Sequence, residues 1–238
     1  MVRRAAPLLS LTAAVAAYTA GAGRLWEASL WPDLLFVTLV VFPAFLWLVW
    51  LALPFREERW LLPAGLGLAA AAVALRLADL DVLFNLAKLF ALVALGFWFL
   101  TWFETVLWTA LVALIIPWVD VVSVWQGPTE YVVEEQPQIF DNVSIAFRVP
   151  GEESTANLGP PDVLFFALFL AATKRFGLRP ALTWLAMTAA LGATLILSAT
   201  TDVAGLPALP AICVGFLLPN ADLLWRELRR PRTEEPAA

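Results

Sequence analysis

Long runs of apolar residues alternate with short polar connections along most of the chain. A run of about 20 apolar residues is long enough to cross the hydrocarbon core of a bilayer as a helix. The pattern predicts eight helices, at about residues 5–22, 32–53, 60–78, 82–101, 104–126, 161–177, 181–199 and 204–225. We therefore expect an all-α fold, a polytopic bundle of about eight transmembrane spans.

The first apolar run has a second interpretation. Arg3 and Arg4 precede it, and it ends in Ala20-Gly21-Ala22, which is also typical of a cleavable signal peptide. Residues 1–22 are thus predicted to be either a span or a signal peptide.

Basic residues indicate which ends of the spans face the cytoplasm. They cluster before the first run and after the second, sixth and eighth, as Arg3 and Arg4; Arg56 and Arg59; Lys174, Arg175 and Arg179; and Arg226, Arg229, Arg230 and Arg232. All four clusters fall on one side if every run crosses the membrane. This predicts that both termini are cytoplasmic, and we expect a prokaryotic plasma membrane.

The opposite side receives the loop 127–161, which is rich in Glu and Asp and contains Arg148 as its single basic residue. Residues 142–149 are rich in β-branched and aromatic side chains and partly alternate, which favours a strand that pairs with 131–133. The alternative is a solvated acidic loop. The chain is thus divided into N-terminal helices (1–103), a second group of helices with this loop (104–225) and a tail (226–238).

Composition supports a membrane protein, since 61% of the residues are hydrophobic and 15% are charged. There is no histidine, which excludes His-containing zinc sites and Ser-His or Cys-His nucleophile pairs. Cys213, the single cysteine, is expected to be a small core residue. No glycine-rich phosphate loop or basic nucleic-acid surface is present. Lys88 and Arg76, inside apolar runs, are expected to extend their charges to the membrane interface.

Two aspartates interrupt the apolar pattern. Asp120 lies six residues before the end of its run, and Asp162 opens the next run. Ionisable groups inside a membrane are costly and usually functional. Helices joined on one side bring both carboxylates to a similar depth, where one acts as a base toward water and the other as an acid toward a carbonyl.

Each aspartate also has a structural interpretation. Pro-Pro-Asp162 is a good helix start, because proline fits the first turn and an acid favours the helix N-terminus. Asp120 would then bond a neighbouring helix or line a water cavity. Leu206-Pro-Ala-Leu-Pro210 begins the last run, either as a proline-initiated helix or as exposed backbone that bonds an extended substrate.

These three elements, in this order, resemble the presenilin and signal peptide peptidase family of intramembrane aspartyl proteases. That family has a Tyr-Asp pair, a Gly-x-Gly-Asp motif and a Pro-Ala-Leu motif. The corresponding residues are Val119-Asp120, Gly159-Pro-Pro-Asp162 and Pro207-Ala208-Leu209. The family usually has nine spans, and Val119 and Pro161 depart from its pattern. The resemblance covers about residues 104–225.

The resemblance implies an aspartic endopeptidase that cleaves transmembrane-helix substrates in the lipid bilayer. Asp120 and Asp162 would be catalytic, and Gly159, Pro207, Ala208 and Leu209 would contact the substrate. Water is the nucleophile, and no metal or other cofactor is implied. A strand edge in 143–149 is expected to hold the unwound substrate. Pro161 motivates the alternative of an inactive, helix-binding homologue, and a proton-coupled carrier that uses the two Asp as a relay is a third hypothesis.

Overall fold

The computed structural model describes residues 2–26, 28–126, 140, 142–152, 154–201 and 206–229. All eight apolar runs form helices, as expected. The α-helices are α1 (Val2–Gly21), α2 (Leu30–Phe36), α3 (Phe42–Ala52), α4 (Leu61–Leu77), α5 (Asp81–Phe99), α6 (Val106–Gln126), α9 (Pro160–Arg175), α10 (Pro180–Thr200) and α11 (Leu209–Leu228). The π-helical turn Val37–Val41 joins α2 and α3 into one continuous segment.

Within the described part of the chain, five helical segments are long and apolar enough to cross a membrane. They are Ala5–Arg24, Leu30–Phe55, Asp81–Trp102, Val106–Val124 and Pro180–Thr200, and α4 is a shorter apolar helix. These helices are what an integral membrane protein requires, because a helix satisfies its own backbone groups in lipid.

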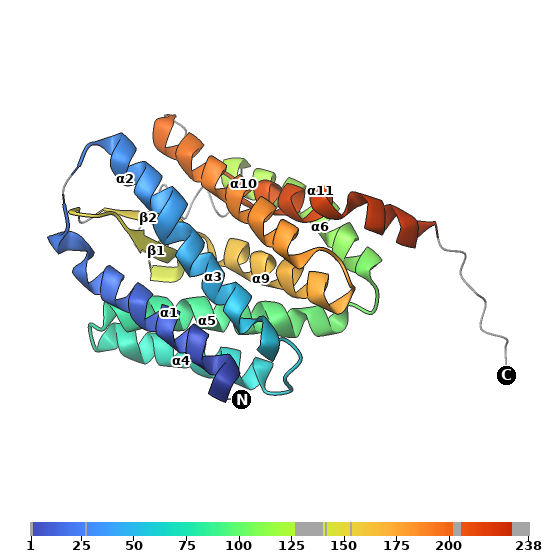
Figure 1. Ribbon diagram of the computed structural model, residues 1–238, viewed down its shortest axis with the longest axis horizontal. Helices are drawn as coiled ribbons and strands as arrows, with labels where there is room; N and C mark the ends of the chain where they lie inside the picture. The colour runs from blue at the N-terminus through green and yellow to red at the C-terminus, as the bar shows by residue number, and fades with distance from the viewer. Residues whose placement is uncertain are drawn as a thin grey trace.

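Helix α9 is the centre of the bundle. It contacts α5, α6, α10 and α11, which surround it (Figure 1). Its residues 166–173 are almost completely buried. A helix that is apolar on all sides is expected to be enclosed by others, so the surrounding helices hold the first turn of α9, and with it Asp162, in a defined place.

Two glycines allow the closest helix contacts. A Cβ atom at Gly96 of α5 would lie 2.5 Å from the carbonyl oxygen of Leu164 on α9. At Gly215 of α11 it would lie 2.5 Å from the Cα atom of Met187 on α10. Both distances are shorter than real atoms tolerate, so side chains at these positions would push the helices apart.

A β-hairpin interrupts the otherwise helical fold, so the expected all-α class needs one correction. Strand β1 (Ile145–Arg148) pairs antiparallel with β2 (Thr155–Leu158), with Ile145 opposite Leu158. Figure 1 shows the hairpin at one end of the bundle, between α2 and α5. The strand predicted in 142–149 is confirmed, while its predicted partner, 131–133, lies outside the described residues.

Side chains of the N-terminal helices fasten the outer edge of β1. Asn85 of α5 donates to the carbonyl oxygen of Ala146 (2.8 Å) and accepts from its N–H (2.9 Å). The hydroxyl of Tyr18 donates to the carbonyl oxygen of Arg148 at 2.7 Å. Lys88 donates to the carbonyl oxygens of Asn142 and Ser144, so its ammonium binds this segment instead of simply reaching the interface as predicted.

Helix α1 belongs to the same bundle. It packs against α3 and α5, and Val15 on its inner face is 4% exposed. The amide of Gly151, in the hairpin turn, donates to the carbonyl oxygen of Ala22 just after α1. These contacts join α1 to the rest of the bundle, and the choice between a span and a signal peptide for residues 1–22 stays a prediction.

Candidate active site

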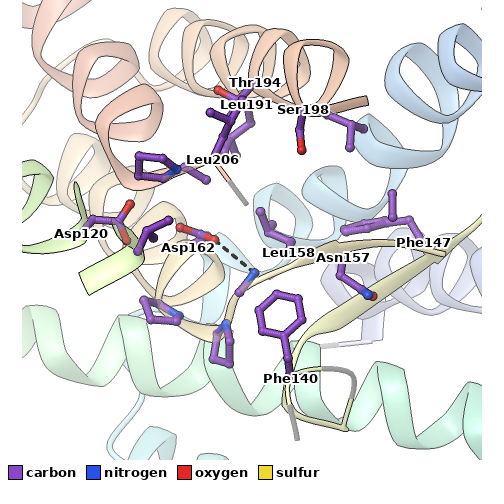
Figure 2. Close-up of a pocket in the computed structure, with 18 of the residues that line it drawn as sticks. Asp120, Phe140, Phe147, Asn157, Leu158, Asp162, Leu191, Thr194, Ser198 and Leu206 are labelled. Carbon is purple, nitrogen blue, oxygen red and sulfur yellow. Dashed lines mark hydrogen bonds between the residues drawn. The ribbon is translucent and has the colours of Figure 1, made fainter. Parts of the chain in front are cut away.

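A cavity of about 490 Å³ lies where α6, α9, α10, the hairpin and the segment before α11 meet. Asp120 and Asp162 both line it. Figure 2 shows the two side chains next to each other in the wall of the cavity, with their carboxylates directed toward each other. The structure therefore brings together the two acids that the sequence singled out.

Asp120 is held by the start of the last helix. Its Oδ2 atom accepts a 3.0 Å hydrogen bond from the backbone N–H of Leu209. Leu209 is the first residue of α11, and the first N–H groups of a helix have no acceptor within that helix. The carboxylate of Asp120, on α6, supplies the missing acceptor. This is the bond to a neighbouring helix that the structural interpretation of Asp120 predicted.

Asp162 is held by the start of its own helix. It is the third residue of α9, and its Oδ2 atom accepts a 3.1 Å hydrogen bond from the backbone N–H of Gly159. The amide of Asp162 in turn donates to the carbonyl oxygen of Gly159 at 3.1 Å. The interpretation of Asp162 as a helix-start residue is thus confirmed, and the same residue is 9% exposed and faces Asp120.

Pro161 is compatible with this geometry. Gly159 is the N-cap of α9, with an extended ψ of 151°, and the two prolines occupy the first turn. The N–H groups of that turn lack intrahelical acceptors, so the missing proline donor removes no helical hydrogen bond. The departure from a glycine at 161 therefore leaves the placement of Asp162 intact.

Gly159 itself is tightly placed. A Cβ atom built on Gly159 would lie 3.0 Å from Oδ2 of Asp162. A side chain at position 159 would therefore require the carboxylate of Asp162 to shift by a few tenths of an ångström, although the φ of −63° is one that any residue adopts.

The Pro-Ala-Leu segment lies where it was expected. Pro207 and Ala208 line the cavity, whereas the side chain of Leu209 is buried in the core at 4% exposure. Leu209 therefore acts on the site through its backbone amide and not through its side chain. Gly159, Pro207 and Ala208 remain the predicted residues that a ligand in the cavity would meet.

Strand β2 contributes most of the hairpin wall of the cavity, and the sequence did not indicate this strand. Ala156, Asn157 and Leu158 contribute to the wall and lead directly to Gly159 (Figure 2). The predicted segment 143–149 contributes Val143 and Phe147. Because Ala146 directs both of its backbone groups to Asn85, the outer edge of β1 is occupied and does not suit strand addition. Strand addition by 143–149 is therefore not supported.

Helix α10 supplies a wall that the sequence did not reveal. Leu191, Thr194, Leu195 and Ser198 line the cavity. Their spacing places them on one face of a helix. That spacing was visible, but an apolar face with two hydroxyls is common in membrane helices and carries no specific signal.

The chemistry of the site is that of two carboxylates. Among the residues that the structure describes, no group of three or more Cys, Asp or Glu side chains is arranged to hold a metal ion. One oxygen of each aspartate is engaged by a backbone amide, and the other oxygen is left to act on a water or a carbonyl. Cys213 is buried in the core, as expected.

Comparison of the chain with family models, with curated proteins and with solved structures finds no match.

Proposed function

We propose that this protein is an intramembrane aspartic endopeptidase of the presenilin-like kind. The observation that carries the proposal is the facing pair Asp120 and Asp162 in a cavity between apolar helices, each carboxylate held by one backbone amide. A structural role would explain either aspartate alone. It does not explain why both charges, from two helices, are directed at the same space.

The reaction would follow from the shared environment of the two acids. Two carboxylates that face each other in a low-dielectric site share one proton, because ionising both is costly. The ionised member removes a proton from water, whose oxygen attacks the scissile carbonyl carbon. The protonated member donates its proton to the carbonyl oxygen. Collapse of the resulting diol, with proton transfer to the amide nitrogen, breaks the C–N bond.

The cavity suits an apolar, locally extended peptide. Its walls include Phe42, Leu191 and Leu195, and strand β2 forms one side. A transmembrane helix hides its amides in internal hydrogen bonds, so the substrate must unwind where it is cut. The cavity volume of about 490 Å³ is enough for only a few amino-acid residues. This agrees with unwinding of the substrate over a short segment.

The proposal includes the membrane arrangement. All eight helical segments would cross, α4, α9 and α11 together with the five segments that are long and apolar enough by themselves, with the hairpin on the extracytoplasmic side and both termini in the cytoplasm. Substrates are proposed to be proteins with a single apolar helix.

Cleavage of a panel of single-span helical substrates by purified protein in liposomes tests the proposal. The intact protein is expected to cut at least one substrate, and Asp120→Asn and Asp162→Asn each to lower the rate by about a thousandfold or more, since removing a catalytic residue abolishes most of the acceleration. Asp222→Asn is the matched control, because Asp222 is an exposed partner of Arg179 far from the cavity.

Two results would argue against a peptidase. Cutting that persists in both dyad variants would point to a contaminating protease. No cutting by the intact protein across the panel and several pH values would favour a helix-binding homologue, or a carrier if a proton flux needs Asp120.

A further inference from the structure

Asp33, in the first turn of α2, is a buried carboxyl group without a hydrogen-bond partner among the residues that the structure describes. It is 2% exposed, and neither of its carboxylate oxygens has a hydrogen-bond partner among the described residues. A buried unpaired carboxylate is among the most costly groups in a folded protein. A ligand that brings a positive charge would offset this cost.

A second cavity, of about 350 Å³, adjoins this residue. Its lining includes Asp33, Glu152, Ser154 and Thr155. The charged side chains in the described lining are the two acids, with no Lys or Arg beside them. The hydroxyl of Ser154 donates to the carboxylate of Glu152. The second cavity therefore contains two acids and has a larger share of polar wall than the cavity around Asp120 and Asp162.

The two cavities are neighbours. Ala156, Asn157, Leu195 and Ser198 line both of them. Strand β2 runs along this common wall from Gly159, which bonds Asp162, back to Thr155. Four residues of extended chain span about 13 Å. A peptide lying along β2 would thus bring a residue about four positions from the scissile bond to the second cavity.

We infer that the second cavity is a subsite for a basic side chain that flanks the apolar segment of the substrate, with Asp33 and Glu152 as its charge partners. The inference rests on the proposed peptidase function. A Lys or Arg at the end of an apolar membrane segment places its charge at the interface, beside the apolar part. The oxygens of Asp33 are covered by the wall, so binding includes rotation of this side chain toward the ammonium or guanidinium group.

The charges of the two cavities match such a segment. Its apolar part meets Phe42 and Leu191 beside the dyad, and its basic end meets Asp33 and Glu152. Basic residues are uncommon on the extracytoplasmic flank of membrane helices because of the positive-inside bias. A subsite that requires one there would select a small class of substrates.

Peptide binding tests the inference without relying on cleavage. In the Asp162→Asn background, one apolar single-span peptide is compared in versions that place a lysine, or a glutamine, at each of the six positions of its hairpin-side flank. At the best position we expect lysine to tighten binding by about tenfold, the effect of one charge pair in a partly buried site. Asp33→Asn is expected to lower the lysine-to-glutamine ratio to about threefold or less, since Glu152 remains, and to leave binding of the glutamine peptide unaffected.

Two further variants complete the design. Asp81→Asn is the matched control, because Asp81 is exposed, pairs with Arg76 and lines neither cavity, and it should keep the full ratio. Glu152→Gln provides a second test if Asp33→Asn fails to fold, with an expected drop of about threefold in the ratio, since this acid lies nearer to solvent.

A ratio near one at every position in the protein that retains Asp33, or a tenfold ratio that survives Asp33→Asn, overturns the inference. So does a preference for calcium: stabilisation by calcium chloride alone that depends on Asp33, with no lysine preference, would assign the cavity to a metal ion. Lysine-selective binding without any cleavage by the intact protein would reject the peptidase and keep the subsite, whereas cleavage without lysine selectivity would do the reverse.

Discussion

The backbone N–H of Leu209 and the carboxylate of Asp120 form a 3.0 Å hydrogen bond, although 89 residues separate them in the chain. The bond ties the first turn of α11 to α6, a helix that is mostly exposed on its outer face. This one hydrogen bond therefore positions an acid of the proposed dyad, and it also fixes the last residue of the Pro-Ala-Leu segment beside that acid. Two of the three sequence elements that suggested a protease, Asp120 and the Pro-Ala-Leu segment, are therefore in direct contact.

Replacing Asp120 separates its chemical role from its structural role. Asn keeps an oxygen that accepts from Leu209 but cannot act as a base, so Asp120→Asn should keep its thermal stability and lose its activity. Asp120→Ala leaves the Leu209 amide without its acceptor, which costs about 1–3 kcal/mol when the group is buried. Thermal unfolding in detergent measures the difference. Equal stability of the Asn and Ala variants would contradict a structural role for the bond.

Gly159→Ala is expected to impair catalysis and leave the fold intact. The added methyl group would lie 3.0 Å from Oδ2 of Asp162, so the carboxylate must shift by a few tenths of an ångström. Misplacement of a catalytic group lowers rates steeply, and we expect a loss of roughly tenfold to a hundredfold in kcat/KM. Gly23→Ala, where the methyl group meets nothing within 4 Å, is the control. Unchanged cleavage by Gly159→Ala would show that catalysis does not depend on the close approach of residue 159 to the carboxylate of Asp162.

Asn85→Leu should loosen the hairpin. Leucine leaves both the N–H and the C=O of Ala146 without the partners that Asn85 provides, at a cost of about 1–3 kcal/mol for each buried group. Hydrogen exchange at the backbone amides of Ala146 and Phe147 should become faster. Cleavage should fall, because β2 lines the cavity and is held in place by its pairing with β1. Asn142→Ala, which keeps the backbone oxygen that Lys88 binds, should change neither. Slow exchange in Asn85→Leu would show that other contacts hold β1.

Gly96→Ala should destabilise the bundle. The new methyl group would approach the carbonyl oxygen of Leu164 to 2.5 Å and force α5 away from α9. Overpacking of this kind costs about 1–3 kcal/mol. Gly67→Ala, in α4, adds a methyl group to open space and should instead stabilise the helix by about 0.5–1 kcal/mol. Melting temperatures of the two variants should therefore move in opposite directions, and a common direction would contradict the close contact of α5 and α9.

Much of the candidate site could be predicted from single residues of the sequence. Asp120 and Asp162 stood out because a charge inside an apolar run is an exception that needs a cause. The wall that Leu195 and Ser198 form could not be predicted, because residues of these types are common throughout membrane helices. Asp33 was overlooked because it lies near the start of an apolar run, where an acid is normally a solvated helix-start residue. Its burial, at 2% exposure, is visible only after the hairpin and α10 are in place.

The sequence by itself determined the helices and the two acids. Each apolar run must satisfy its backbone groups internally, so its length and composition are enough to predict a helix. Tertiary structure decided what faces what: the bond from Leu209 to Asp120, the pairing of β1 with β2, the attachment of Ala146 to Asn85 and the burial of Asp33. These contacts join residues far apart in the chain. They depend on how closely helices approach at positions such as Gly96 and Gly215, a property of the packed bundle that no local pattern of hydrophobic residues contains.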